Sequence, residues 1–198
     1  MPANTQKTIH ADTVVQELVS NEEQRQLSKI GLIPSENHIS PAVSAVLSSC
    51  LSSKYAEGYP HRRYYEGNQY IDQLEVLAQE RVKDLFNKGP ASQSGSDKGE
   101  VRHVNVQPYS GSPANSAVQF GLLEPGDTVM GLALASGGHL THGHPKVTFS
   151  GKYFRSVGYG LGKDARIDFE ALRAQVLQER PKLLIAGTTA YPFILDFK

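Results

Sequence analysis

The sequence lacks several features that would place a protein in a specialised class. It contains no tryptophan and a single cysteine, Cys50, and its twenty basic residues balance twenty acidic ones. A lone cysteine cannot form an intramolecular disulfide, which favours a reducing compartment. The zero net charge removes the electrostatic argument for nucleic acid or an anionic membrane as the main partner.

Long apolar runs are also absent. No run approaches the length of a membrane-spanning helix, and residues 1–11 carry neither the basic nor the apolar region of a secretory signal. We therefore expect a cytoplasmic protein with no nucleic-acid and no membrane partner, which acts on small molecules or other proteins. At 198 residues the chain is long enough to bury a core of its own.

The first part of the chain carries start signals for three helices. Asp12 can cap a helix that runs to about Lys29. The pair Ser40-Pro41 supplies an N-cap and a first-turn proline for a second helix, and Asn68 opens a third, amphipathic helix. The second helix is expected to end near Cys50 and the third at Phe86. Residues 1–52 are thus predicted to form a helical arm, with an apolar stripe made by Val14, Val15, Leu18 and Val19.

The second part of the chain alternates strand and helix patterns. It follows a segment rich in turn formers, residues 87–100, which we interpret as a surface loop. The first three elements after that loop predict a βαβ unit, which implies a parallel sheet. The predicted fold class is therefore α/β, with a parallel or mixed sheet flanked by helices. The expected strands are 103–109, 128–134, 147–149, 154–159 and 183–187, and the expected helices are 113–123 and 168–180.

The segment from Lys54 to Gly67 has the most informative composition of the chain. Four tyrosines, two arginines and two glutamates lie there among glycines and a proline. Polar aromatic and charged side chains held by turn residues indicate a site. Partial burial among tyrosines would suit Glu57 to exchange a proton near neutral pH. The alternative is a surface ion pair between Glu57 and Arg62 or Arg63.

Two further segments could bind a ligand. Ser110-Gly111-Ser112 lies between a predicted strand and a predicted helix, where hydroxyls and free N–H groups could bind an oxyanion such as phosphate. The alternative is that a serine there only caps the helix. The second segment, 137–144, holds three histidines among glycines. It fits a small-ligand site or solvated loop histidines better than a metal site, because no nearby carboxylate or cysteine completes a metal shell.

With the segments Ser35-Glu36-Asn37 and Tyr55-Ala56-Glu57-Gly58-Tyr59-Pro60, these motifs resemble serine hydroxymethyltransferase, a pyridoxal 5'-phosphate (PLP) enzyme of one-carbon metabolism. The resemblance runs from about Leu32 to Asp196. It implies the type I fold of PLP-dependent transferases, with residues 53–198 as the first part of the PLP-binding large domain. It also implies interconversion of serine and tetrahydrofolate with glycine and methylenetetrahydrofolate, by a homodimer or tetramer.

The resemblance assigns a role to each matching residue. Glu57 corresponds to the catalytic acid and base, and His139 to a catalytic residue that stacks on the PLP ring. Substrate binding is implied for Ser35, Tyr55 and Tyr65, the two tyrosines reaching across a dimer interface. The remaining implied contacts are Ser110, Gly111 and Ser112 with the PLP phosphate, Thr189 near the PLP 3-oxygen, and Leu134, Gly138 and Leu140 with folate. From sequence alone, the alternative for Ser35 is a turn hydroxyl after proline.

Some features depart from the family pattern. His61 and Glu66 stand where many members have glycine, and Thr189 stands where serine is usual. Three residues of the family have no counterpart in this sequence: the Schiff-base lysine, the aspartate that pairs with the pyridine nitrogen, and the arginine that binds the substrate carboxylate. We therefore interpret the chain as an N-terminal part that is inactive alone. The alternatives are a truncated binding or dimerisation module without catalysis, and another PLP enzyme of the same fold, such as a threonine aldolase or an aminotransferase.

Overall fold

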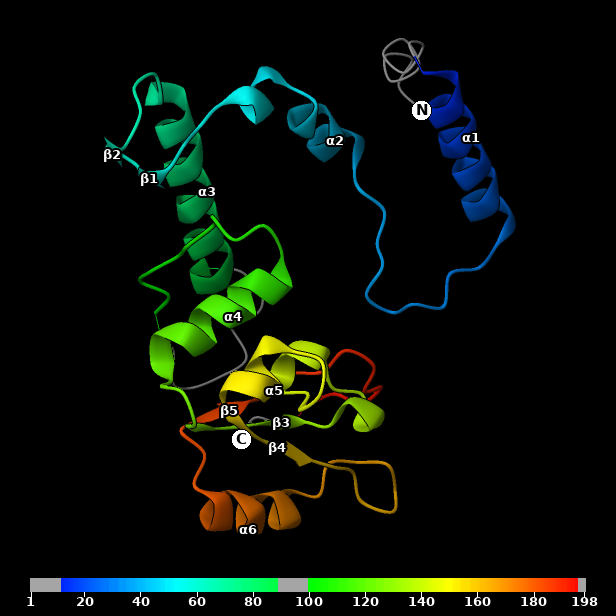
Figure 1. The fold of residues 1–198 in the computed structure, drawn as a ribbon, viewed down its shortest axis with the longest axis vertical. Helices are drawn as coiled ribbons and strands as arrows, with labels where there is room; N and C mark the ends of the chain where they lie inside the picture. Colours follow the sequence, from blue (N-terminus) through cyan, green and yellow to red (C-terminus); the bar gives the residue numbers. More distant parts are fainter. Residues whose placement is uncertain (1–11, 89–99, 196–198) are drawn as a thin grey trace. The chain divides into compact units, whose positions relative to one another are not determined.

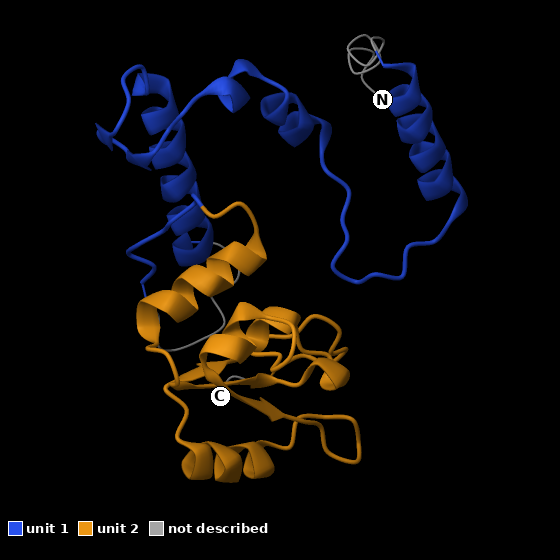
Figure 2. Cartoon of the chain, viewed as in Figure 1, with its two compact units in different colours: residues 1–107 blue, residues 108–198 orange. Residues whose placement is uncertain are grey.

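The computed structural model describes residues 12–88 and 100–195, so most of the expected loop at 87–100 lies outside the described residues. The chain divides into two compact units, residues 1–107 and 108–198 (Figure 2). Helices predominate in the first unit, and the second unit contains a parallel sheet with helices (Figure 1). The α/β class is therefore confirmed, whereas the division at residue 52 remains a prediction.

The first two helices of unit 1 begin at the predicted caps. Helix α1 (Thr13–Ser28) is capped by Asp12, whose Oδ1 accepts hydrogen bonds from the N–H groups of Val14 and Val15 at 3.0 and 3.1 Å. Helix α2 (Pro41–Leu47) is capped by Ser40. It ends at Leu47, before the predicted Cys50, because the chain turns into the 3-10 helix η1 (Cys50–Ser53).

The apolar stripe of α1 is exposed. Val14 is 65% exposed and Leu18 63% exposed, and no residue of α1 is buried. Cap chemistry rather than burial therefore accounts for where this helix begins. Apolar side chains that remain this exposed bury little surface against the described residues, so they contribute little to the stability of the fold.

A short hairpin joins η1 to the long helix of unit 1. Its strands are β1 (Gly58–Tyr59) and β2 (Arg62–Arg63), which pair antiparallel around the turn Pro60–His61. His61 has a φ of 63°, in the left-handed region that favours glycine, which explains why glycine suits this position. Helix α3 (Gln69–Lys88) follows, and its start agrees with the expected opening at Asn68.

The expected strand at 103–109 is wrong, since none of its residues joins a sheet. Side chains hold the chain around it instead. Asn87 exchanges hydrogen bonds with the backbone of Val101 at 2.8 and 3.1 Å, and Gln107 donates to the carbonyl oxygen of Gly58 at 3.0 Å. Alternating apolar residues gave the segment a strand pattern, but a strand also needs a neighbouring backbone to pair with.

Unit 2 is built on three parallel strands, although the first strand of the expected βαβ unit does not form. Strand β3 (Thr128–Leu132) lies between β4 (Arg155–Tyr159) and β5 (Leu183–Ile185). Met130 pairs with Val157 on one side and with Leu184 on the other. The predicted strands around these ranges are therefore confirmed, with β3 ending at Leu132 rather than at residue 134.

Helices cover both faces of this sheet (Figure 1). Helix α6 (Phe169–Glu179), capped by Asp168 as predicted, packs Leu172 and Val176 against a buried cluster that includes Met130 and Leu132. The opposite face carries α4 (Gly111–Leu122) and α5 (Phe149–Tyr153). Buried on that face are Leu123, Val129 and Phe154.

The expected strand at 147–149 is wrong, because α5 begins there. Thr148 accepts a hydrogen bond from the N–H of Gly151 at 3.3 Å and thereby caps the helix. A β-branched residue next to Phe149 resembled a short strand, but threonine before a helical turn is also an N-cap. None of the helices in the described parts of the chain is both long and apolar enough to cross a bilayer.

Backbone segments approach one another closely just after β3. A Cβ at Gly138 would overlap the carbonyl group of Leu132, and one at Gly137 would lie 2.9 Å from the backbone nitrogen of Tyr191. We expect Gly138→Ala to lower the free energy of unfolding by about 3 kcal/mol, because backbone rather than a flexible side chain must move. Denaturant unfolding measures this.

The matched control for that substitution is Gly160→Ala. A Cβ there meets only Ser136 Oγ, at 3.9 Å, which is an ordinary contact. Its unfolding free energy should stay within about 0.5 kcal/mol of the unaltered chain. Equal effects of the two substitutions would contradict the close approach at Gly138.

Acid should weaken a buried ion pair in unit 1. A hydrogen bond from Arg63 and a second from the backbone N–H of His61 hold the pKa of Asp72 below its ordinary 3.8. A depressed carboxyl pKa contributes stability above the unfolded pKa, and this contribution is lost as the pH falls through the folded pKa. The His61 amide proton, followed by NMR, should therefore titrate with a midpoint below 3.8. Asp72→Asn should abolish that titration, and a midpoint above 3.8 would contradict the ion pair.

Candidate functional site

Loops at the carboxyl ends of two neighbouring strands lie together in unit 2. After β3 the chain forms the 3-10 helix η3 (Leu134–Ser136), then Gly137 and Gly138. After β5 it returns, and the N–H of Thr189 donates to the carbonyl oxygen of Gly137 at 2.8 Å. Parallel sheets bind their ligands at this edge. Thr189 is thus brought beside the glycines that precede His139.

Hydrogen bonds fix the ring of His139. Its Nδ1 accepts from the backbone N–H of Thr141 at 3.1 Å and lies 2.8 Å from Thr141 Oγ1. That hydroxyl accepts from Asn115 Nδ2 at 2.8 Å, so it can donate its own proton to Nδ1. With two donors on Nδ1, the neutral ring carries its proton on Nε2.

Beside His139 lies a hollow of about 310 Å³, which Leu134, His142 and Ser156 also line. The rings of His139 and His142 are 5.6 Å apart between centroids. Burial first, and the neighbouring His139 second, lower the pKa of His142, and its buried Nδ1 has no hydrogen-bond partner among the described residues. Among the described residues, no three or more histidine, cysteine, aspartate or glutamate side chains lie close enough together to bind a metal ion.

The turn before α4 has unused donors. Ser110 occupies the N-cap position, but its side chain makes no capping hydrogen bond, which argues against the simple capping role. A Cβ added at Gly111 would meet nothing within 4 Å, so the space beside this glycine is open. Pro113 lacks an N–H group, which leaves the N–H groups of Gly111 and Ser112 with two hydroxyls at the positive end of α4. This donor set suits an oxyanion.

Helix α4 also supports the histidine loop. Asn115 binds the hydroxyl of Thr141, and Gln119 Nε2 donates to the carbonyl oxygen of Thr141 at 2.7 Å. Gln119 is only 2% exposed, so this is a buried polar contact. One helix thus carries the turn of Ser110 to Ser112 at its N-terminus and the support for His139 one and two turns further on. Sequence reasoning missed Asn115, Gln119 and Thr141. For Asn115 and Gln119, polar residues within the predicted helix were the available signal.

The three residues matched to folate contacts are adjacent but differently exposed. Leu134 and Leu140 are 46% and 40% exposed, whereas Gly138 is buried. Leu140 opens the 3-10 helix η4 (Leu140–His142), which begins directly after His139. The two leucines can therefore offer an apolar surface to a ligand, while Gly138 is held by close backbone packing.

The predicted residues of unit 1 lie on the hairpin and its flanks. The rings of Tyr55 and Tyr65 pack edge to face, 5.8 Å apart between centroids. Glu57 is exposed, so the described residues do not supply the partial burial that the sequence analysis invoked. The alternative ion pair is also not formed with Arg63, whose guanidinium binds Asp72 and Glu75 instead.

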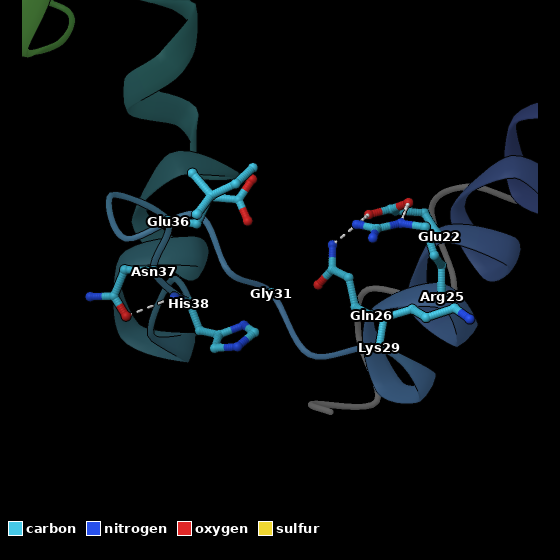
Figure 3. A pocket seen from close by; sticks show the side chains of 9 residues that line it. Glu22, Arg25, Gln26, Lys29, Gly31, Glu36, Asn37 and His38 are labelled. Atoms are coloured by element: carbon cyan, nitrogen blue, oxygen red, sulfur yellow. Dashed lines mark hydrogen bonds and ion pairs between the residues drawn. The ribbon is translucent and has the colours of Figure 1, made fainter. Parts of the chain in front are cut away.

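Ser35 lies in an exposed turn, in which the N–H of Glu36 donates to the carbonyl oxygen of Ile33 at 3.2 Å. Close by, a hollow of about 470 Å³ is lined by polar residues of α1 and of the segment around Glu36 (Figure 3). Glu22 and Arg25 form an ion pair on one side of it, and His38 lies on the other. Ser35 is not among its lining residues, and the hollow contains none of the predicted site residues.

Comparison with known proteins agrees with these motifs. Residues 9–198 match the family model described as serine hydroxymethyltransferase. A serine hydroxymethyltransferase of Acidothermus cellulolyticus is 54% identical over 187 residues, and one of Desulfotalea psychrophila is 51% identical over 186 residues. Each alignment covers 94% of this chain, which spans 40% of the relative's length. The chain belongs to the serine hydroxymethyltransferase family.

Proposed function

We propose that the protein catalyses the interconversion of serine and tetrahydrofolate with glycine and methylenetetrahydrofolate, with PLP as its cofactor. Family membership supports the reaction class, and the chain contributes one part of the machinery because it spans 40% of the length of its relatives. The proposal includes the type I fold of PLP-dependent transferases, an arm over residues 1–52 and a cofactor-binding part over residues 53–198. It also includes a homodimer or tetramer in the cytoplasm.

The observation that carries the proposal is the anion-binding turn before α4. The hydroxyls of Ser110 and Ser112 and the N–H groups of Gly111 and Ser112 would hold the cofactor's phosphate. The turn fits this group because Ser110 makes no capping bond and the space beside Gly111 is open. When bound, PLP supplies an electron sink for bond breaking at the amino acid.

His139 would orient the cofactor ring. Its own ring is held by Thr141, so it presents a flat face in a fixed direction. An aromatic ring held in this way can stack on another with little loss of side-chain entropy. Thr189 lies beside the preceding glycines and would approach the cofactor's 3-oxygen, while Leu134, Gly138 and Leu140 would contact folate.

The hairpin of unit 1 would supply the proton chemistry. We assign to Glu57 the role of holding and returning the proton of the substrate hydroxyl, since a carboxylate with no competing ion pair among the described residues can serve as acid and base. Tyr55 and Tyr65 would contact the substrate across a subunit interface, and Ser35 would contact its carboxylate. A monomer would then lack complete sites.

Removing the two hydroxyls should weaken cofactor binding. In the full-length protein, Ser110→Ala with Ser112→Ala removes two hydrogen bonds to a charged phosphate. We expect the dissociation constant of PLP to rise by roughly 100-fold, measured by absorbance titration. Unfolding of the cofactor-free protein should be unchanged, because Ser110 makes no capping bond. The control is Ser116→Ala in the same helix, and equal affinities of the two variants would contradict the phosphate site.

Replacing the proposed acid and base should affect turnover but not cofactor binding. In the full-length protein, Glu57→Gln should lower the folate-dependent rate by roughly 10²–10⁴-fold, the usual contribution of acid–base catalysis. The absorbance spectrum of bound PLP and the dissociation constant of the cofactor should not change. Unchanged turnover would remove Glu57 from the mechanism, while loss of the cofactor would indicate a structural role.

A further inference from the structure

The backbone around Glu57 is held at three consecutive carbonyl groups. Arg63 Nη1 donates to the carbonyl oxygens of Ala56 and Gly58, at 2.8 and 2.7 Å. The N–H of Tyr64 donates to the carbonyl oxygen of Glu57 itself at 3.1 Å. The side chain of Glu57 is exposed, whereas the chain that carries it is fixed on both sides by one guanidinium group.

That guanidinium group is itself fixed to helix α3. Its Nε donates to Asp72 Oδ1 at 2.8 Å and its Nη2 to Glu75 Oε2 at 2.7 Å. The side chain of Arg63 is only 4% exposed, and those of Asp72 and Glu75 are 9% and 11% exposed. Asp72 and Glu75 are three residues apart, so they lie on the same face of the helix. A planar guanidinium with donors in fixed directions can join such a face to two carbonyl groups.

The hairpin is shaped to accept this arrangement. Gly58 has a φ of 92°, and a Cβ there would lie 2.5 Å from the carbonyl oxygen of Arg62. Gln107 Nε2 donates to the carbonyl oxygen of Gly58 at 3.0 Å and to Glu75 Oε1 at 2.9 Å. The carbonyl oxygen of Gly58 therefore accepts from two side chains, both of which also bind Glu75.

A buried ion pair often adds little net stability compared with apolar packing, but the planar guanidinium of Arg63 joins its four partners in fixed directions. Arg63 already pairs with two carboxylates, those of Asp72 and Glu75, and Glu57 is left without an ion pair among the described residues. We infer that Arg63 is a positioning residue, which holds the backbone of Glu57 on α3 so that the exposed carboxylate is presented from a rigid support. This inference rests on the proposed function, because it assumes that Glu57 moves a proton.

The test compares two neighbouring arginines in the full-length protein with PLP bound. Arg63→Lys keeps the charge, but a lysine amine cannot span two carboxylates and two carbonyl oxygens. The control is Arg62→Lys. Arg62 is exposed, and its guanidinium forms no hydrogen bond with the described residues. Arg63→Lys should speed hydrogen exchange of the Tyr64 amide at least tenfold, while exchange of the Leu77 amide in α3 stays the same.

Kinetics distinguish positioning from stability alone. Arg63→Lys should lower the folate-dependent kcat at least tenfold and change the KM for serine less than twofold, with cofactor affinity unchanged. In a Glu57→Gln background the same substitution should lower the residual kcat less than twofold, because Arg63 acts through Glu57. A wild-type kcat in Arg63→Lys, or equal losses with and without Glu57, would overturn the inference.

The outcomes also separate this inference from the proposed function. Unchanged turnover in Glu57→Gln would overturn both. Loss of turnover in Glu57→Gln with a wild-type kcat in Arg63→Lys would overturn only the positioning role. If Arg63→Lys does not fold, Gln107→Met provides the second variant, since it removes the other donor to Gly58. It should lower kcat several-fold and speed exchange of the Tyr64 amide, and failure of both effects would overturn the inference.

Discussion

Hydrogen bonds from α4 to Thr141 determine how the candidate site of unit 2 is held. Asn115 and Gln119 bind the side chain and the backbone of that threonine, and the threonine in turn binds His139. The same helix presents the turn of Ser110 to Ser112 at its N-terminus. Because a helix is stiff over this length, this turn and the histidine loop are held on one support. Loss of either contact would weaken the attachment of the loop of His139 to the helix.

The backbone after β3 adds a second constraint. Gly137 and Gly138 approach other backbone groups too closely for any side chain, and Gly137 also accepts hydrogen bonds from Thr189 and Ala190. The loop before His139 is thus fixed from beneath by the sheet and from the side by the chain after β5. Glycine in this loop serves packing first, and a ligand can use the surface that the packing creates.

Local chemistry made part of the fold predictable. The caps Asp12, Ser40 and Asp168 all begin helices where the sequence predicts them, because a cap needs only neighbouring residues. The strands expected at 103–109 and 147–149 are wrong, because strand formation depends on a partner that is distant in sequence. The candidate site shows the same limit. The sequence motifs of the site could be recognised. The partners of Arg63 and the support of His139 by Asn115 depend on tertiary contacts, which the sequence does not reveal. The roles of the site residues remain predictions.

The support of Glu57 has a consequence for the order of folding. Arg63 is separated by 7 and 5 residues from its carbonyl partners and by 9 and 12 residues from its carboxylate partners. Closing such short loops costs little chain entropy and takes well under a microsecond. The contact from Gln107 to Gly58 spans 49 residues and requires the whole of α3 first. The hairpin can therefore assemble on α3 while a ribosome is still adding later residues, and Gln107 closes over a geometry already established.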